Sequence, residues 1–406
     1  MRVSSVWSAR SVRSVSRSLL ALALLAPAFT VAAQGAPPLR DLPKPSRELD
    51  EPYSLVAALR EARGGLVVVA DGMEGELTVV DFATGARTAL GRQGSGPGEY
   101  RAPGAVFRIR GDTLWVMDPT QQRFTVFLPD QKAGVPFHLD MFDTQTRTAI
   151  MAPFAMDAQG LMYSGALPVI GGGGSMSIPD SIEVIRFDPR VSSATGGGSN
   201  GRTSIGKLRF PTSGKPEMRV EGQVIHYKMA FPGLVTADSW AVFPDGRVAI
   251  VHGATYTVEF VKPDGSRTTS RPIAIDRIPV TAADKDAEMV EARRVLAEQS
   301  KAVQRSMPPG FTLQIEMTPP ESWPASYPAV TPLAIFAAPD GMLWVRRATP
   351  TRLDRENWDV IGPTGTLTAR WQLPTRTRLV GVGNGVVYTV RLDEDDLQYL
   401  ARVPVR

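Results

Sequence analysis

Three histidines are the residues of this chain that exchange protons most readily near neutral pH. His138, His226 and His252 lie far apart in the sequence, and no two of them have the spacing of zinc ligands. Structural or solvated histidines are the simpler interpretation, but His226 and His252 could also reach one surface and act together as acid and base. The histidines therefore predict no metal site, and we expect no cofactor.

Four arginines between residues 346 and 355 could bind an anion or the carboxylate of a peptide. Asp118 and Arg123 occupy the corresponding loop of an earlier sequence repeat. A solvated polar rim is the alternative interpretation, because such side chains are mostly exposed. The residues predicted to bind a ligand are Asp118, Arg123, His252, Arg346 and Arg347.

Two further segments suggest ligand sites at first sight. Residues 91–98 read Gly-Arg-Gln-Gly-Ser-Gly-Pro-Gly, but neither a Lys-Ser/Thr pair nor a predicted helix follows, so a connecting loop is a better interpretation than a phosphate cradle. The acidic run 393–396 lacks the glycine and the distal glutamate of a calcium loop. It indicates a solvated hairpin tip.

The N-terminal residues have the pattern of a secretory signal peptide. Residues 1–18 carry four arginines and no acid, an apolar run follows from Leu19 to Ala26, and the small residues 31–33 predict cleavage after Ala33. The apolar run is shorter than the ~20 residues that a membrane-spanning helix needs. We therefore expect a periplasmic or secreted protein without stable membrane insertion, with an uncleaved anchor as the alternative.

The predicted mature chain has no formal net charge and no cysteine. Removal of residues 1–33 takes away four arginines, which brings the charge from +4 to zero. A neutral chain lacks the basic surface of a nucleic-acid-binding protein. The absence of cysteine excludes disulfides, thiolate metal sites and thiol nucleophiles, so the burial of apolar side chains must stabilise the fold.

The elements that would position these residues share one signature. A glycine-containing turn that leads into a β-rich run recurs six times, at Gly65, Gly111, Gly160, Gly246, Gly341 and Gly385. The shorter separations, about 44 to 49 residues, match one blade of a propeller. An apolar strand precedes each turn and an alternating strand follows it. The sequence therefore predicts an all-β fold, a six-bladed β-propeller with four-stranded antiparallel blades, in a single domain over residues 34–406.

The last repeat has no fourth strand of its own after its third, residues 397–403. Closed propellers avoid such an open edge by taking a strand from the other end of the chain. We expect residues 37–42 to pair with residues 397–403 and close the propeller.

Most of the added length falls on the face formed by the connections between strands two and three and between blades. The largest insertion, about residues 277–330, predicts one helix over residues 282–306, with Thr281 as N-cap and Asp284 three residues on. A helix packed over the propeller rim is the simpler interpretation, and a mobile lid is the alternative. Insertions usually mark the binding face of a repeat fold, so this face is the predicted binding surface.

The central channel is predicted to be poor in charge. The segments assigned to the six innermost strands, such as 54–57, 153–156 and 332–335, hold no carboxylate and no histidine. Propeller enzymes usually place such groups along the channel. This pattern argues against a calcium-dependent hydrolase or lactonase.

Residues 91–100, 111–118, 339–345 and 396–403 resemble the exported six-bladed β-propeller proteins related to the NHL-repeat and TolB-like propellers. Such propellers serve as scaffolds, as ligand binders and occasionally as lyases or hydrolases, so the resemblance implies an architecture more strongly than an activity. We expect a monomeric binding module that presents its loop-rich face to a protein, peptide or glycan. A hydrolase or lyase with a site at the channel mouth is the alternative.

Overall fold

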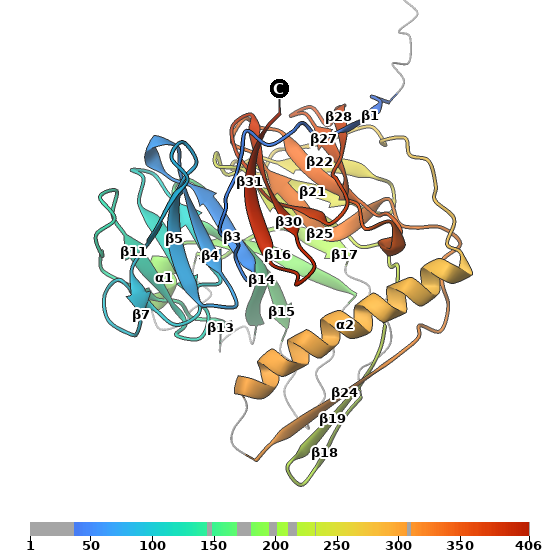
Figure 1. Cartoon of the computed structure of the whole chain (residues 1–406), viewed down its shortest axis with the longest axis horizontal. Helices are drawn as coiled ribbons and strands as arrows, with labels where there is room; N and C mark the ends of the chain where they lie inside the picture. The colour runs from blue at the N-terminus through green and yellow to red at the C-terminus, as the bar shows by residue number, and fades with distance from the viewer. Residues whose placement is uncertain are drawn as a thin grey trace, which may run out of the picture. The chain divides into compact units, whose positions relative to one another are not determined.

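The structure is a computed structural model that describes residues 36–143, 148–168, 180–194, 201–209, 217–231, 233–306 and 310–405. Within the unit Ala36–Arg406, six antiparallel sheets follow one another along the chain as the blades of a β-propeller (Figure 1). The predicted all-β class and the six blades are confirmed. The predicted signal peptide, residues 1–33, lies outside the described residues.

The first three blades have four consecutive strands each, with the innermost strand first. Blade one contains β3 (Val56–Glu61), β4 (Leu66–Asp71), β5 (Glu76–Asp81) and β6 (Ala86–Ala89). Blade two contains β9 (Ala105–Arg108), β10 (Leu114–Asp118), β11 (Arg123–Phe127) and β12 (Phe137–His138). Blade three contains β14 (Thr148–Met156), β15 (Met162–Pro168), β16 (Ser181–Phe187) and β17 (Thr203–Arg209), with β13 (Phe142–Asp143) paired to β14 and the short helix α1 (Pro189–Ala194) before β17.

The last three blades repeat this order. Blade four contains β20 (Ser239–Val242), β21 (Val248–His252), β22 (Thr257–Val261) and β23 (Arg267–Thr269). Blade five contains β25 (Val330–Ala337), β26 (Leu343–Arg347), β27 (Asn357–Ile361) and β28 (Leu367–Gln372). Blade six contains β29 (Thr377–Val382), β30 (Val386–Leu392) and β31 (Gln398–Pro404).

The six recurring glycines stand where the backbone must turn from the first strand of a blade into the second. All six have positive φ angles, between 66° and 87°. This left-handed region costs a residue with a side chain more than it costs glycine, so the turn selects glycine at this position. The glycine spacing therefore follows from the geometry of one hairpin in each blade.

Buried apolar clusters hold neighbouring blades together. The described residues form six such clusters, one at each interface between blades. Each blade is therefore covered on both faces, and its second strand reads as a continuous apolar run instead of an alternating one. In β4, for example, Val67, Val68 and Val69 are all fully buried.

A segment before the first blade closes the propeller, but a different one from that predicted. Arg47 and Glu48 form β2 (Arg47–Glu48), which pairs antiparallel with β31 of blade six. Leu49 and Tyr53 continue this pairing and bury their side chains in the cluster between blades six and one. These two apolar side chains fix which segment closes the ring.

The predicted closing segment, residues 37–42, instead extends blade five. Its strand β1 (Leu39–Asp41) pairs in parallel with β28, and its three side chains are exposed. The prediction that residues 37–42 pair with residues 397–403 is therefore wrong. Residues 39–41 carry no side chain that packs into the core, so they lie on an outer edge.

Two insertions from different blade connections form one additional sheet. The connection from blade three to blade four supplies β18 (Glu217–Glu221) and β19 (Val224–Ala230), and the connection from blade four to blade five supplies β24 (Thr312–Thr318). β19 pairs antiparallel with β18 and in parallel with β24. We call β18, β19 and β24 the insertion sheet, which the sequence analysis did not predict.

The helix α2 (Ala282–Ser306) has the predicted bounds and the predicted N-cap. The Thr281 hydroxyl donates a hydrogen bond of 2.6 Å to Asp284, and the Asp284 backbone N–H lies 3.3 Å from the Thr281 Oγ1. α2 contacts both β24 and the short helix η2 (Thr351–Leu353) of blade five (Figure 1). Among the described residues, no helix is long and apolar enough to span a membrane.

Candidate functional site

The innermost strands enclose two adjoining cavities along the propeller channel. The first, the mouth cavity, has a volume of about 360 Å³ and is bordered by the turns that follow the innermost strands, including Gly111, Ala158, Pro244 and Pro339. The second, the inner cavity, has a volume of about 380 Å³. Both are lined by Arg60, Phe107, Val242, Ala337 and Val382, so they meet at this level of the channel.

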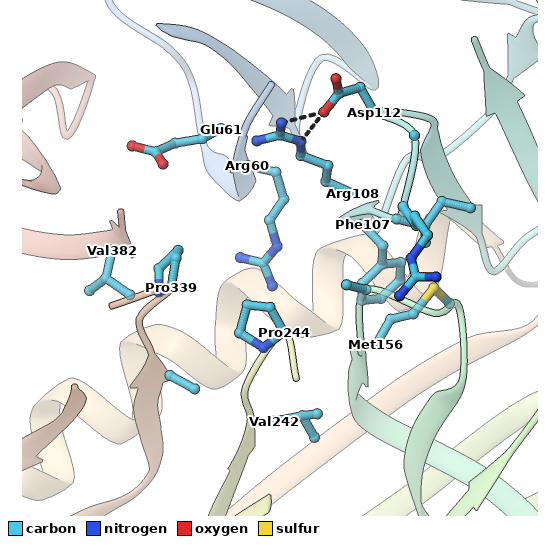
Figure 2. Close-up of a pocket in the computed structure, with 15 residues that line it drawn as sticks. Arg60, Glu61, Phe107, Arg108, Asp112, Met156, Val242, Pro244, Pro339 and Val382 are labelled. Atoms are coloured by element: carbon cyan, nitrogen blue, oxygen red, sulfur yellow. Dashed lines mark hydrogen bonds and ion pairs between the residues drawn. The ribbon is translucent and has the colours of Figure 1, made fainter. Parts of the chain in front are cut away.

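Arg60 extends from β3 into the mouth cavity (Figure 2). Its guanidinium lies among Pro244, Pro339 and Phe107. The side chain is exposed to the space of the channel, yet protein surrounds it, and the resulting desolvation lowers the pKa of Arg60. The Arg60 Nη1 donates a hydrogen bond of 3.1 Å to the carbonyl oxygen of Leu59. No carboxylate of the described residues forms an ion pair with it.

Arg60 corrects the prediction of a charge-poor channel. β3 continues four residues beyond the segment 54–57 that was predicted to line the channel, and its last two residues are Arg60 and Glu61. The end of a strand is uncertain by a few residues when it is predicted from sequence, so these two charged residues were left out. Residues 54–57 carry no charge and could not indicate that the channel contains a cation.

Three of the other charged groups around the mouth cavity have partners, namely Arg108, Asp112 and Glu61. The Arg108 Nε donates a hydrogen bond of 3.0 Å to Asp112, and this ion pair lowers the pKa of Asp112 (Figure 2). The Glu61 carboxylate accepts a hydrogen bond of 2.8 Å from the Tyr388 hydroxyl. Together with Arg60 and the exposed Arg110, the described lining carries three arginines and two carboxylates, a net charge of +1.

The inner cavity is apolar apart from Arg60. Its described lining consists of small and apolar residues from all six innermost strands and the turns beside them, and Arg60 is the one charged residue among them. Leu333 also lines this cavity, with a φ of 61° and an exposed fraction of 38%. An apolar side chain in a strained backbone conformation, left open toward a cavity, is typical of a binding site.

A third cavity opens on the predicted binding face, between the connections that enter blades four and five. It has a volume of about 470 Å³ and is bordered by residues 233–236 on one side and 322–324 on the other, with Arg209 at its edge. We call it the insertion groove. Trp323 is partly buried and lies 5.7 Å from Phe231, measured between ring centroids. Arg209 and Trp323 lie in separate parts of the sequence and belong to no motif, so the sequence alone does not indicate that they share a site.

Asp118 lies at the end of β10 and is fully buried. One carboxylate oxygen accepts hydrogen bonds from the Arg101 backbone N–H at 2.6 Å and from the Gln121 side chain at 2.8 Å, and the other accepts one of 2.6 Å from the Thr120 hydroxyl. Burial raises the pKa of Asp118, but these hydrogen bonds outweigh burial and leave the pKa below its usual value. In this structure the Asp118 carboxylate fixes the loop between two strands.

Arg123 holds the glycine-rich loop. Its guanidinium donates hydrogen bonds to the carbonyl oxygens of Ser95 at 2.6 Å and Glu99 at 2.7 Å. The loop in turn donates its Ser95 and Gly96 backbone N–H groups to the Glu99 carboxylate, at 2.9 and 2.7 Å. These bonds, the Gly96 bond above all, lower the pKa of Glu99. The backbone N–H groups of the loop therefore bind the carboxylate of Glu99, a residue of the same loop.

His252 lies at the end of β21 between two carboxylates. Its Nδ1 is 3.5 Å from Asp238, and its Nε2 is 3.4 Å from Glu259. His226 lies on β19, 3.7 Å from Glu221. The described contacts of the two histidines share no residue, so they give no support to a joint acid–base role.

Arg346 and Arg347 form ion pairs with buried acids of blade five. Arg346 lies 3.2 Å from Glu356, and Arg347 lies 3.4 Å from Asp359. Arg347 is buried, whereas the side chains of Arg346 and His252 are exposed to 32% and 33%. Of the predicted binding residues, Asp118 and Arg347 are buried, whereas Arg123, His252 and Arg346 are partly accessible.

No protein-family model matches the sequence, and no curated protein matches it. Among solved structures, the chain is similar to a protein of Bacteroides fragilis that is described as exported, with 12% identity over 91% of this chain and 94% of that one and a TM-score of 0.45. It is also similar to the calcium-binding protein regucalcin of Agrobacterium tumefaciens, with 12% identity over 91% and 98% and a TM-score of 0.38. A third similarity is to virginiamycin B lyase of Staphylococcus aureus, with 9% identity over 89% and 87% and a TM-score of 0.35.

Proposed function

We propose that this protein is an exported, monomeric binding module that holds an extended peptide segment in the insertion groove. The observation that carries the proposal is the groove itself, which exists because residues 322–324 of one insertion lie opposite residues 233–236 of another. The cavity is open to the solvent, so it can hold part of a ligand that extends beyond it. The leader-like residues 1–33 support export.

The residues around the groove favour a peptide that has both apolar and acidic side chains. Leu234, Val235 and Pro324 offer apolar surface, and Trp323 adds an aromatic ring that is partly buried against Phe231. Tryptophan and arginine are the side chains that most often dominate binding energy at interfaces.

Arg209 supplies the charge on one side of the groove. It ends β17 and its side chain is exposed. A guanidinium in this position can bind the carboxylate of an aspartate or glutamate through two parallel hydrogen bonds. The proposed ligand is therefore a segment with an acidic residue close to an aromatic or aliphatic one.

The competing function is a hydrolase or lyase that uses His226, His252 and the arginines of blade five. The contacts of these residues favour binding over catalysis. Arg346 forms an ion pair with Glu356, and Arg347 forms one with Asp359. These two carboxylates are therefore engaged by arginines and are not free to act as a general base. A general base needs a geometry in which it can reach the proton of a bound substrate.

A peptide array tests the proposal. The purified mature protein is applied to random peptides that vary in acidic and aromatic content, and the dissociation constant of the best peptide is then measured by fluorescence anisotropy. We expect Trp323→Ala to weaken binding by at least about 30-fold. Arg209→Glu should weaken it by about tenfold or more, with a smaller effect at high salt.

The control is Lys132→Glu, which reverses a charge on an exposed hairpin turn of blade two, on the other face of the propeller. This variant should bind the peptide as the wild type does. Equal affinity of Trp323→Ala and wild type, or preferential binding of a glycan array over the peptides, would overturn the proposal.

A further inference from the structure

We propose that the propeller channel is a second binding site, specific for a small molecule that has one carboxylate and an apolar body. Arg60 binds the carboxylate, and the inner cavity holds the apolar body. This site is separate from the insertion groove: none of the described residues that line the groove lines either channel cavity.

Arg60 is a cation that borders both cavities and forms no ion pair with a described carboxylate. Its side chain is exposed to the channel, and the protein around it lowers its pKa by desolvation. A planar guanidinium matches a carboxylate through two parallel hydrogen bonds, so a bound carboxylate would supply the counter-charge that the described residues do not provide.

The charge of the cavity lining restricts the charge of the ligand. The described lining of the mouth cavity has a net charge of +1, because Arg108 and Asp112 form an ion pair and Glu61 offsets one further arginine. A monoanion would bring this lining to neutrality, whereas a phosphate dianion would leave an excess negative charge. A cationic ligand would meet Arg60 without a counter-charge. The lining therefore favours a monocarboxylate.

The inner cavity has the surface to hold an apolar ligand body. The innermost strands contribute Ala57, Ala105, Ala155 and Ala241 to the inner cavity, and these short side chains leave the channel open where larger ones would fill it. Leu333 is left 38% exposed toward the same space. An apolar chain or ring of the ligand would cover this surface, and burial of apolar area is the main source of affinity in such pockets.

The carboxylate of the proposed ligand would bind where the two cavities meet. Arg60 lines both cavities, so one guanidinium can bind the head group while the body extends into the inner cavity. The Trp240 indole Nε1 in the wall of the inner cavity is buried and has no partner among the described residues.

Isothermal titration calorimetry with four probes of similar length tests the site. The probes are octanoate, octanol, octylammonium and hexyl phosphate, each titrated into the purified mature protein. We expect octanoate to bind most tightly and octylammonium not to bind. Arg60→Gln should weaken octanoate binding by about ten- to a hundredfold, because a charge-assisted bidentate contact is lost.

Three further variants keep the result interpretable. Arg271→Gln removes an exposed arginine that lines neither cavity, and it should bind octanoate as the wild type does. Ala337→Phe narrows the channel beside Arg60 and should weaken octanoate binding while Arg60 is still present. Trp323→Ala changes the insertion groove alone and should leave octanoate binding unchanged, which separates this site from the proposed peptide site.

The proposal is overturned by any of three results. The first is octanoate affinity that is the same in Arg60→Gln and in the wild type. The second is binding of octylammonium or hexyl phosphate that is as tight as binding of octanoate. The third is no heat of binding for octanoate at millimolar concentration in a wild-type protein that is folded by circular dichroism.

Discussion

The Tyr256 hydroxyl of blade four donates a hydrogen bond of 2.6 Å to the Oδ2 atom of Asp359 in blade five. Asp359 is almost fully buried, and Arg347 and Arg370 each lie 3.4 Å from its carboxylate. Burial, and then the neighbouring Asp359, raise the pKa of Tyr256 well above its usual value, so the hydroxyl remains a donor. This polar cluster ties two blades together at the base of the predicted arginine site.

Loss of Asp359 should destabilise the protein more than loss of the Tyr256 hydroxyl. Asp359→Asn leaves two arginines near a neutral group, at an expected cost of about 3 to 5 kcal/mol in the free energy of unfolding. Tyr256→Phe removes one hydrogen bond and should cost about 1 to 3 kcal/mol. Urea unfolding measures both. A larger loss in Tyr256→Phe than in Asp359→Asn would contradict this account of the cluster.

The closing segment can be tested by comparing its Leu49 with Leu39, which lies in the segment that extends blade five. Leu49 is 5% exposed in the cluster between blades six and one, whereas Leu39 is 39% exposed on the outer edge of blade five. Leu49→Ala should lower the free energy of unfolding by about 2 to 5 kcal/mol. Leu39→Ala is the matched control and should change it by less than about 0.5 kcal/mol. If the two variants have equal stability, residues 46–53 do not close the propeller.

Asp118 should make stability depend on pH in the acid range. Its pKa is lower in the folded than in the unfolded protein, so the ionised form stabilises the fold above its unfolded pKa of about 4, and this contribution is lost as the pH falls through the folded pKa. Asp118→Asn should cost about 1 to 3 kcal/mol at pH 7. The difference from wild type should shrink below pH 4.

The measurement for Asp118 is the melting temperature of both proteins from pH 3 to pH 8. Glu394→Gln serves as a control, because this exposed residue lies in the acidic hairpin tip. Its difference from wild type should be small throughout. A gap between Asp118→Asn and wild type that is constant over the whole range would show that ionisation of Asp118 does not stabilise the loop.

The helix α2 should be held on blade five by a small number of polar contacts. The Arg352 Nε donates a hydrogen bond of 2.6 Å to Asp284, and the Thr351 hydroxyl donates one of 2.6 Å to Glu288. Arg352→Ala should increase the rate of tryptic cleavage after Arg293 and Arg294 within the helix, because local unfolding becomes easier. Mass spectrometry identifies the fragments. Rapid cleavage of the wild-type helix at these sites would instead indicate a mobile lid.

The repeat could be predicted from the sequence because each blade needs the same hairpin turn between its first and second strands. Gly111 and Gly341 mark hairpin turns with positive φ, and this requirement is visible in the residue type. The bounds of α2 could also be predicted, since Thr281 and Asp284 form a local N-cap. Both features depend on residues that are close in the sequence.

Features that depend on distant pairing could not be predicted in this way. β19 and β24 form a parallel pair between two separate insertions, and no turn joins them directly. The insertion groove depends on the same pairing of distant segments. Arg60 was missed for a different reason, because the end of a strand is uncertain by a few residues, and here the last two residues of β3 carry the charge.

Hydrogen exchange of the protein with its best-bound array peptide tests the proposed function most directly. The account predicts slower amide exchange in residues 233–236 and 322–324, which border the insertion groove, with no change in the turns around the mouth cavity. The loss of this protection in Trp323→Ala would confirm the site. Protection confined to the channel turns, or no peptide that binds at all, would contradict the account.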